Sequence, residues 1–241
     1  MKRLTVLLLA LLLTLTLCSC NTKEETSDND EPKVTNTDNQ TDIKAEDTNE
    51  ETENNADETD EAIEFTRGTV TNNTYESKYA GLGIELDDTW TFSSDEEINT
   101  LMGIAGDLSG DEQRKALIEA LAITDMVAIN PNAYSVVVTF EKNLPSVLKT
   151  ISMDTVMDNT IASTKSTYEN LGVTDTQIEK TTVNIQGEEF NAIRMKVNYM
   201  GVDMYQSMIM KKCYGHIAAI AITSTEEDIF DDIVSKMYIV K

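Results

Sequence analysis

Residues 178–223 decide the fold, and they read IEKTTVNIQGEEFNAIRMKVNYMGVDMYQSMIMKKCYGHIAAIAIT. Apolar and β-branched residues alternate with polar ones along this stretch, and no helical period runs through it. Turn-forming glycines interrupt it at Gly187, Gly201 and Gly215. We therefore predict a four-strand meander, with strands at 178–185, 190–199, 202–212 and 216–223. The last strand is apolar on both faces, so we place it in the middle of the sheet.

Further strand signals lie on both sides of the meander. Residues 68–86 are rich in Thr, Val and Tyr and turn at Asn72-Asn73. A hairpin is expected from strands at 126–129 and 134–140, joined through Asn130-Pro131-Asn132. A short edge strand is expected at 238–240.

Capping residues predict four helices between these strands. Ser94 with Glu97 forms a capping box for a helix that ends near residue 103. A second box predicts a helix at 111–121. Ser152 begins a longer helix that Gly172 ends. The last helix is expected to begin at Thr225, with acidic residues in its first turn where the helix dipole favours them.

This order of elements predicts an α+β fold, with a mainly antiparallel sheet and helices packed on it. Residues 66–241 are enough for one globular domain with its own core. The run Tyr79–Leu86, YAGLGIEL, followed by Trp90, resembles the opening of PsbP/Mog1-like domains, which begin with a Tyr-x-Gly strand, a turn and a Trp. Asp87-Asp88 stands where that family usually has a proline. The resemblance implies the PsbP/Mog1-like fold, and nothing in the residues carries over the photosystem II role of the plant members.

The N-terminus has the pattern of an export signal. Lys2 and Arg3 precede an uncharged run over residues 4–17, which is shorter than the roughly 20 residues that span a bilayer. The run ends in Leu17-Cys18-Ser19-Cys20, which resembles the bacterial lipobox. The resemblance implies that residues 1–19 are a signal peptide and that Cys20 is lipidated. The other interpretation is an ordinary secretory signal without lipid.

Residues 20–65 are interpreted as the lipidated cysteine followed by a disordered acidic tether. Residues 21–65 contain 17 acidic and 3 basic residues and too few apolar ones to offset chain entropy. A cation-binding tail is the alternative to a simple spacer. The formal net charge of the whole chain is -24, which argues against nucleic acid as a partner because phosphate binding needs clustered Lys and Arg.

No catalytic constellation is present in the sequence. The single histidine, His216, excludes HExxH and multi-histidine zinc sites. Ser146 and Lys149 match S-x-x-K, but its partner motifs are missing or misplaced, so we read the match as chance. We predict no catalytic residue, no metal site and no cofactor.

Two groups of residues allow a structural and a functional interpretation. Cys213 and His216 could form a nucleophile–base pair, but residues three apart on one strand face opposite ways, which favours a buried thiol and a strand-end imidazole. Four methionines of the meander could fill the core or line an adaptable binding surface; they are Met195, Met204, Met208 and Met210.

These observations predict a non-catalytic protein held at the extracytoplasmic face of the cell membrane by lipid on Cys20. Lipid-anchored proteins of Gram-positive gut bacteria, with acidic tethers, are similar in this organisation, which implies a Gram-positive cell. The partner is expected to be an envelope protein, a wall polymer or a small ligand. The alternative is a cell-surface enzyme that acts on wall or extracellular material.

Overall fold

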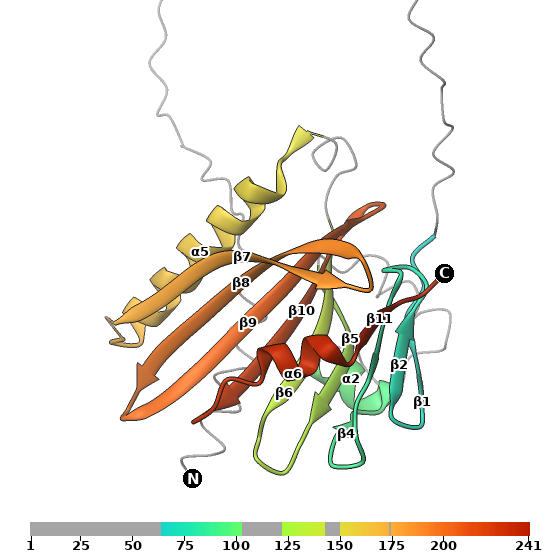
Figure 1. The fold of residues 1–241 in the computed structure, drawn as a ribbon, viewed down its shortest axis with the longest axis horizontal. Coiled ribbons are helices and arrows are strands. Elements are labelled where there is room, and N and C mark those ends of the chain that lie inside the picture. The colour runs from blue at the N-terminus through green and yellow to red at the C-terminus, as the bar shows by residue number, and fades with distance from the viewer. Residues whose placement is uncertain (1–63, 103–121, 143–149, 174) are drawn as a thin grey trace, which may run out of the picture. The chain divides into compact units, whose positions relative to one another are not determined.

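The computed structural model describes residues 64–102, 122–142, 150–173 and 175–241. The predicted signal peptide, Cys20, residues 21–63 of the predicted tether, the predicted helix at 111–121 and the S-x-x-K match lie outside these residues. The described part is an α+β fold made of two antiparallel sheets and three helices (Figure 1).

A seven-stranded sheet forms the larger layer, in the order β4-β5-β6-β10-β9-β8-β7. The predicted meander and its turn positions are confirmed, and β10 lies between β6 and β9 as its two apolar faces require. Gly187 and Gly201 have φ of 96° and 80°, which glycine adopts without strain. The strands are β4 Thr91–Phe92, β5 Ala122–Ile129, β6 Ser135–Lys142, β7 Thr176–Ile185, β8 Glu188–Tyr199, β9 Val202–Cys213 and β10 His216–Thr225.

A separate four-stranded sheet joins the two ends of the domain, in the order β1-β2-β3-β11. Its strands are β1 Thr69–Thr71, β2 Thr74–Ser77, β3 Leu82–Glu85 and β11 Met237–Ile239. Gly83 of β3 faces Tyr238 of β11, and a Cβ at Gly83 would overlap the tyrosine ring. A larger residue at this position would therefore force the ring to move.

Two of the three described helices begin where their caps predict. In α2, Asp95–Leu101, the Ser94 and Glu97 capping box is complete. In α5, Met153–Asn170, the Ser152 hydroxyl accepts a hydrogen bond from Thr155 N–H, and Gly172 follows the helix with φ of 79°. Leu171, the residue that follows the helix, is 40 % exposed.

The prediction for the last helix was wrong at its start. Thr225 is the last residue of β10, and Glu226 has φ of 73°, which a helix cannot contain. The helix α6 is Phe230–Ser235, and the Asp228 carboxylate accepts a hydrogen bond from Phe230 N–H at its start. The acidic residues therefore lie largely before the helix.

The two faces of the seven-stranded sheet are covered differently. One face packs against the small sheet and α6 in a single large core cluster that includes Phe140, Ile222 and Phe230. The opposite face lies under α5 and α2, where the apolar side chains form three smaller clusters. Figure 1 shows α5 and α6 lying over different parts of the seven-stranded sheet.

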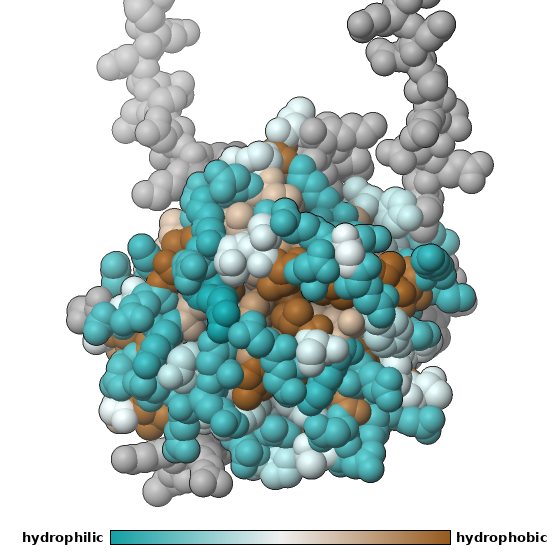
Figure 2. All heavy atoms as spheres, viewed as in Figure 1, coloured by the Kyte–Doolittle hydropathy of each residue, from teal (hydrophilic) through white to brown (hydrophobic). Residues whose placement is uncertain are grey.

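Large apolar side chains rarely reach the surface of the described residues. The exposed ones are scattered at Val70, Leu101, Leu171, Met200 and Tyr214. On the face in Figure 2, apolar side chains appear as separate areas among polar ones. Among the described residues, this face shows no broad apolar patch of the kind that marks a large assembly interface.

Candidate binding groove

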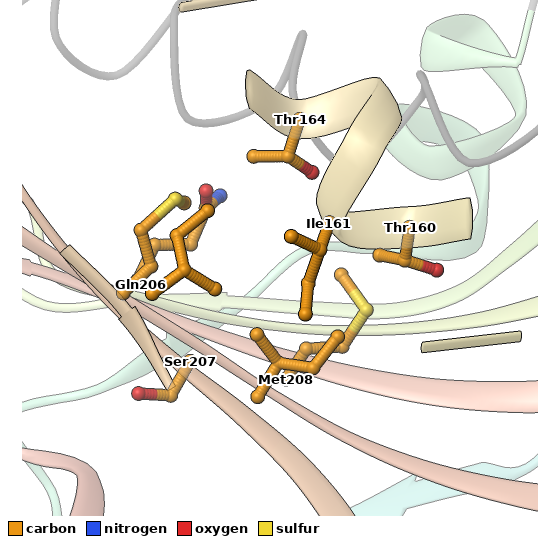
Figure 3. A pocket seen from close by; sticks show the side chains of 9 residues that line it. Thr160, Ile161, Thr164, Gln206, Ser207 and Met208 are labelled. Carbon is orange, nitrogen blue, oxygen red and sulfur yellow. The ribbon is translucent and has the colours of Figure 1, made fainter. Parts of the chain in front are cut away.

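A groove opens between α5 and the outer part of the seven-stranded sheet (Figure 3). Its volume is about 350 Å³ when the part open to solvent is included. Thr160, Ile161 and Thr164 line it from α5. The sheet supplies the other lining residues: Ile178, Ile193, Met195, Gln206, Ser207 and Met208. The described residues of the lining therefore include no charged side chain, in a chain whose formal net charge is -24.

Gln206 is the polar residue at the centre of this groove. Successive residues of a strand face opposite sides, so Gln206 points toward α5 together with Met204 and Met208. Its amide ends on the α5 side of the sheet, across the gap from Thr164, whereas the Ser207 hydroxyl points away (Figure 3). Gln206 is only 5 % exposed, yet its amide has no hydrogen-bond partner among the described residues. The amide keeps a small accessible surface, so water can reach it from the groove.

A second polar group without a partner lies next to the groove. Tyr168 of α5 is fully buried against Met195 and Met204, and its hydroxyl has no hydrogen-bond partner within the described part of the chain. Burial raises the pKa of Tyr168, so the phenol stays protonated and can donate. The Tyr168 hydroxyl is thus buried but unsatisfied, which is uncommon in a packed core.

The groove coincides with a break in the packing under α5. Met157 and Met208 belong to one apolar cluster, whereas Tyr168 and Met204 belong to another. Ile178 contacts both clusters from β7. Gln206 lies between Met204 and Met208 on β9, so the division falls where the amide interrupts the apolar face.

Polar contacts hold the N-terminal half of α5 against the sheet. Lys180 Nζ of β7 lies 2.7 Å from an Asp154 carboxylate oxygen and 2.6 Å from one of Asp158. Hydrogen bonds to these two carboxylates raise the pKa of Lys180. Lys212 Nζ also donates to the Ile151 carbonyl, just before the helix. The groove begins beyond this anchored half, at Thr160.

The structure corrects the geometry expected for Cys213 and His216. They do not lie on one strand: Tyr214-Gly215 turns between them, so they are direct partners across β9 and β10 and both are buried. The His216 Nδ1 atom is 2.7 Å from the Tyr79 hydroxyl oxygen. Burial raises the pKa of the Cys213 thiol, and burial with nearby Lys142 lowers the pKa of His216. Both are neutral at pH 7, which does not suit a nucleophile–base pair.

Phe65, which the sequence places at the end of the tether, packs on this same cluster. Its ring centroid lies 5.1 Å from that of Tyr79 and 5.2 Å from that of Phe140. Next to it, the Asp125 carboxylate binds Arg67 Nε, Gly68 N–H and the Tyr75 hydroxyl, at 3.2, 2.8 and 2.5 Å. The first described residues are thereby fixed to β5.

The four methionines combine the two roles considered for them. All are buried, and Met204 and Met210 fill clusters under α5. Met195 and Met208 also line the groove. Sequence reasoning did not find Gln206 or the Tyr168 hydroxyl, although a polar residue within the alternating methionines of 204–210 was a usable signal for the first.

The described residues offer neither a candidate metal cluster nor a candidate membrane-spanning helix. Among the described residues, no group of three or more His, Cys, Asp or Glu side chains is placed to hold a metal ion. Within the same ranges, no helix has the length and apolar character needed to cross a bilayer.

Comparison with known proteins assigns no family. No protein-family model matches the chain, and no curated protein sequence matches it. Among solved structures, LpqN, described as involved in cell envelope biogenesis of Mycobacterium tuberculosis, is similar over 66 % of this chain and 83 % of its own. The sequence identity is 8 % and the TM-score 0.35, and a similarity at that level assigns neither fold family nor function to this chain.

Proposed function

We propose that this chain is a lipid-anchored protein of the extracytoplasmic face of the membrane, whose domain binds an envelope partner or ligand without catalysis. The groove between α5 and the sheet is its binding site. The observation that carries the proposal is Gln206, a residue only 5 % exposed whose amide has no described partner and points into an otherwise uncharged groove. A bound molecule would give this amide a hydrogen-bond partner.

The anchoring part of the proposal rests on the N-terminal sequence. The basic start, the apolar run and Leu17-Cys18-Ser19-Cys20 support cleavage before Cys20 and its acylation. We also assign the domain to the PsbP/Mog1-like folds. The residues that carry this resemblance, Tyr79, Leu82, Ile84 and Trp90, are all buried in one core cluster.

A thermal-unfolding screen tests the binding function. Wall fragments, peptides, sugars and amino acids are each added to wild type and to Thr164→Phe, which fills the groove from α5. A ligand at 100 times its dissociation constant stabilises the wild type by about 2.7 kcal/mol, and Thr164→Phe should lose most of that shift. Equal shifts in both proteins would place the binding elsewhere.

Membrane fractionation tests the anchor separately. With Cys20→Ala, the chain should leave the membrane fraction and incorporate no labelled palmitate. Cys18→Ala, two residues away in the same segment, is the matched control and should stay lipidated. Palmitate on the Cys20→Ala chain would refute the assignment of Cys20.

A further inference from the structure

We infer that the groove recognises an uncharged peptide segment, with one apolar side chain inserted between α5 and the sheet and its backbone amide paired with Gln206. This inference rests on the proposed binding function and specifies the class of ligand. Its first support is the lining, in which every side chain is uncharged and most are apolar. A charged ligand group would lose its hydration there without gaining a partner.

The chemistry of Gln206 favours a peptide group. A carboxamide carries two N–H donors and a carbonyl acceptor, so it complements the C=O and the N–H of one peptide bond at the same time. An ester or hydroxyl of a lipid headgroup would use only part of this capacity. Because Gln206 is buried and unpartnered, both of its halves are available to a ligand.

The size of the groove and its walls agree with a single inserted side chain. Its volume of about 350 Å³ includes space open to solvent, and the enclosed part has room for a small group only. Met195 and Met208 form part of its walls, and methionine adapts its shape to different apolar groups. A long hydrocarbon chain would have to displace α5, which Lys180 holds through Asp154 and Asp158.

Titration calorimetry with a matched pair of probes tests the inference. The protein is the chain from residue 20 onward with Cys20→Ser, so that it carries no lipid. The probe is acetyl-Ala-Leu-Ala-methylamide, and its partner has an ester oxygen in place of the leucine N–H. The peptide should bind about tenfold more tightly than the ester, since one hydrogen bond to the buried Gln206 is lost.

Variants separate the role of Gln206 from general effects on the domain. Gln206→Met keeps the side-chain length and removes the hydrogen bonds, so it should weaken the peptide and abolish the difference between peptide and ester. Gln177→Met, at an exposed position of β7, should change neither. If Gln206→Met does not fold, Thr164→Phe replaces it and should weaken both probes together.

The outcomes distinguish this inference from the proposed function. A peptide preference that vanishes in Gln206→Met supports both. Binding of 1-hexanoylglycerol through the groove, without binding of the peptide, overturns the peptide inference and leaves the binding function standing. Equal affinities of peptide and ester also overturn the inference. If no probe from the screen or this titration binds in a way that Thr164→Phe blocks, both fail.

Discussion

The two faces of the seven-stranded sheet differ in how completely they are filled. The face toward the small sheet and α6 carries one continuous cluster, in which Ala128, Val136 and Phe140 have no exposed surface. The face under α5 carries separate clusters, a groove with the Gln206 amide in it, and the buried Tyr168 hydroxyl, which has no described partner. Both faces belong to the same strands, so the difference lies in the side chains that alternate along them.

This contrast separates stability from binding. A filled face gains from every buried apolar group and has no room for another molecule. Unsatisfied polar groups lower the stability of a face, and natural proteins commonly retain such groups at functional sites. The face under α5 therefore contributes less to folding and remains open to a ligand.

The largest expected effect lies on the filled face. Phe140→Ala should lower the free energy of unfolding by about 3–5 kcal/mol, because a fully buried ring leaves a cavity in a continuous core. Met208→Ala, beside the groove, should cost about 2 kcal/mol, since Met208 lies next to space that already exists. Urea denaturation measures both, and equal losses would contradict the contrast between the faces.

A second large effect concerns Asp125, which links the first described residues and the small sheet to β5. Asp125→Ala should destabilise the domain by about 3–5 kcal/mol, because it leaves the Tyr75 hydroxyl and Gly68 N–H without their acceptor and removes the buried carboxylate from Arg67 Nε. Asp95 provides the control: it also lies 3.2 Å from Arg67, but its side chain is 84 % exposed. Asp95→Ala should change stability by no more than about 0.5 kcal/mol, and parity of the two variants would argue against the buried contact.

Under α5, removal of polarity should stabilise the domain. Tyr168→Phe eliminates a fully buried hydroxyl without a described partner, so it should raise the free energy of unfolding by about 1 kcal/mol. Gln206→Met removes an amide that water reaches from the groove, so it should raise the free energy of unfolding by less. Gln177→Met on exposed β7 should be neutral. A loss of stability in both groove variants would show that these groups already have partners, and would remove the main support for the binding site.

The effects of pH have opposite signs at two residues, Glu141 and His216. Burial raises the pKa of Glu141 to about 7, so the folded state holds a proton that the unfolded state loses above about 4.5. Stability from this group therefore falls as pH rises from about 4.5 to about 7. The pKa of His216 is lowered, so its contribution falls on acidification below its unfolded value of 6.5.

Single variants assign these two pH effects. Glu141→Gln should remove the loss of stability toward pH 7, and His216→Gln the loss below pH 6.5, in urea midpoints measured between pH 4.5 and 8. An unchanged pH profile in Glu141→Gln would mean that its carboxyl is solvated in the folded state.

Local sequence signals predicted most of the strands and two of the three described helices. The meander was readable because Gly187 and Gly201 mark turns and the side chains between them alternate. The separate small sheet was not, because β3 pairs with β11, which lies about 150 residues further along the chain, and no local pattern encodes that pairing. The start of α6 was misplaced because β10 continues through Thr225.

The candidate site was predictable only in part. The methionines of β8 and β9 indicated either core or binding surface, and the alternation identified the face they share. That Gln206 lacks a partner depends on where α5 lies over the sheet, which a strand pattern does not determine. The favoured interpretation of Cys213 and His216, a buried thiol and a strand-end imidazole, is confirmed. The geometric argument for it was wrong, because a spacing of three was read along one strand, whereas Tyr214-Gly215 is a turn.

The most direct test is a methyl NMR spectrum of the methionine-labelled chain, recorded with and without the uncharged peptide. Met195 and Met208 report on the face under α5, and Met126 and Met237 on the filled face. The account predicts that the first pair shifts on titration while the second pair does not move. Shifts at Met126 and Met237, with Met195 and Met208 unchanged, would contradict it.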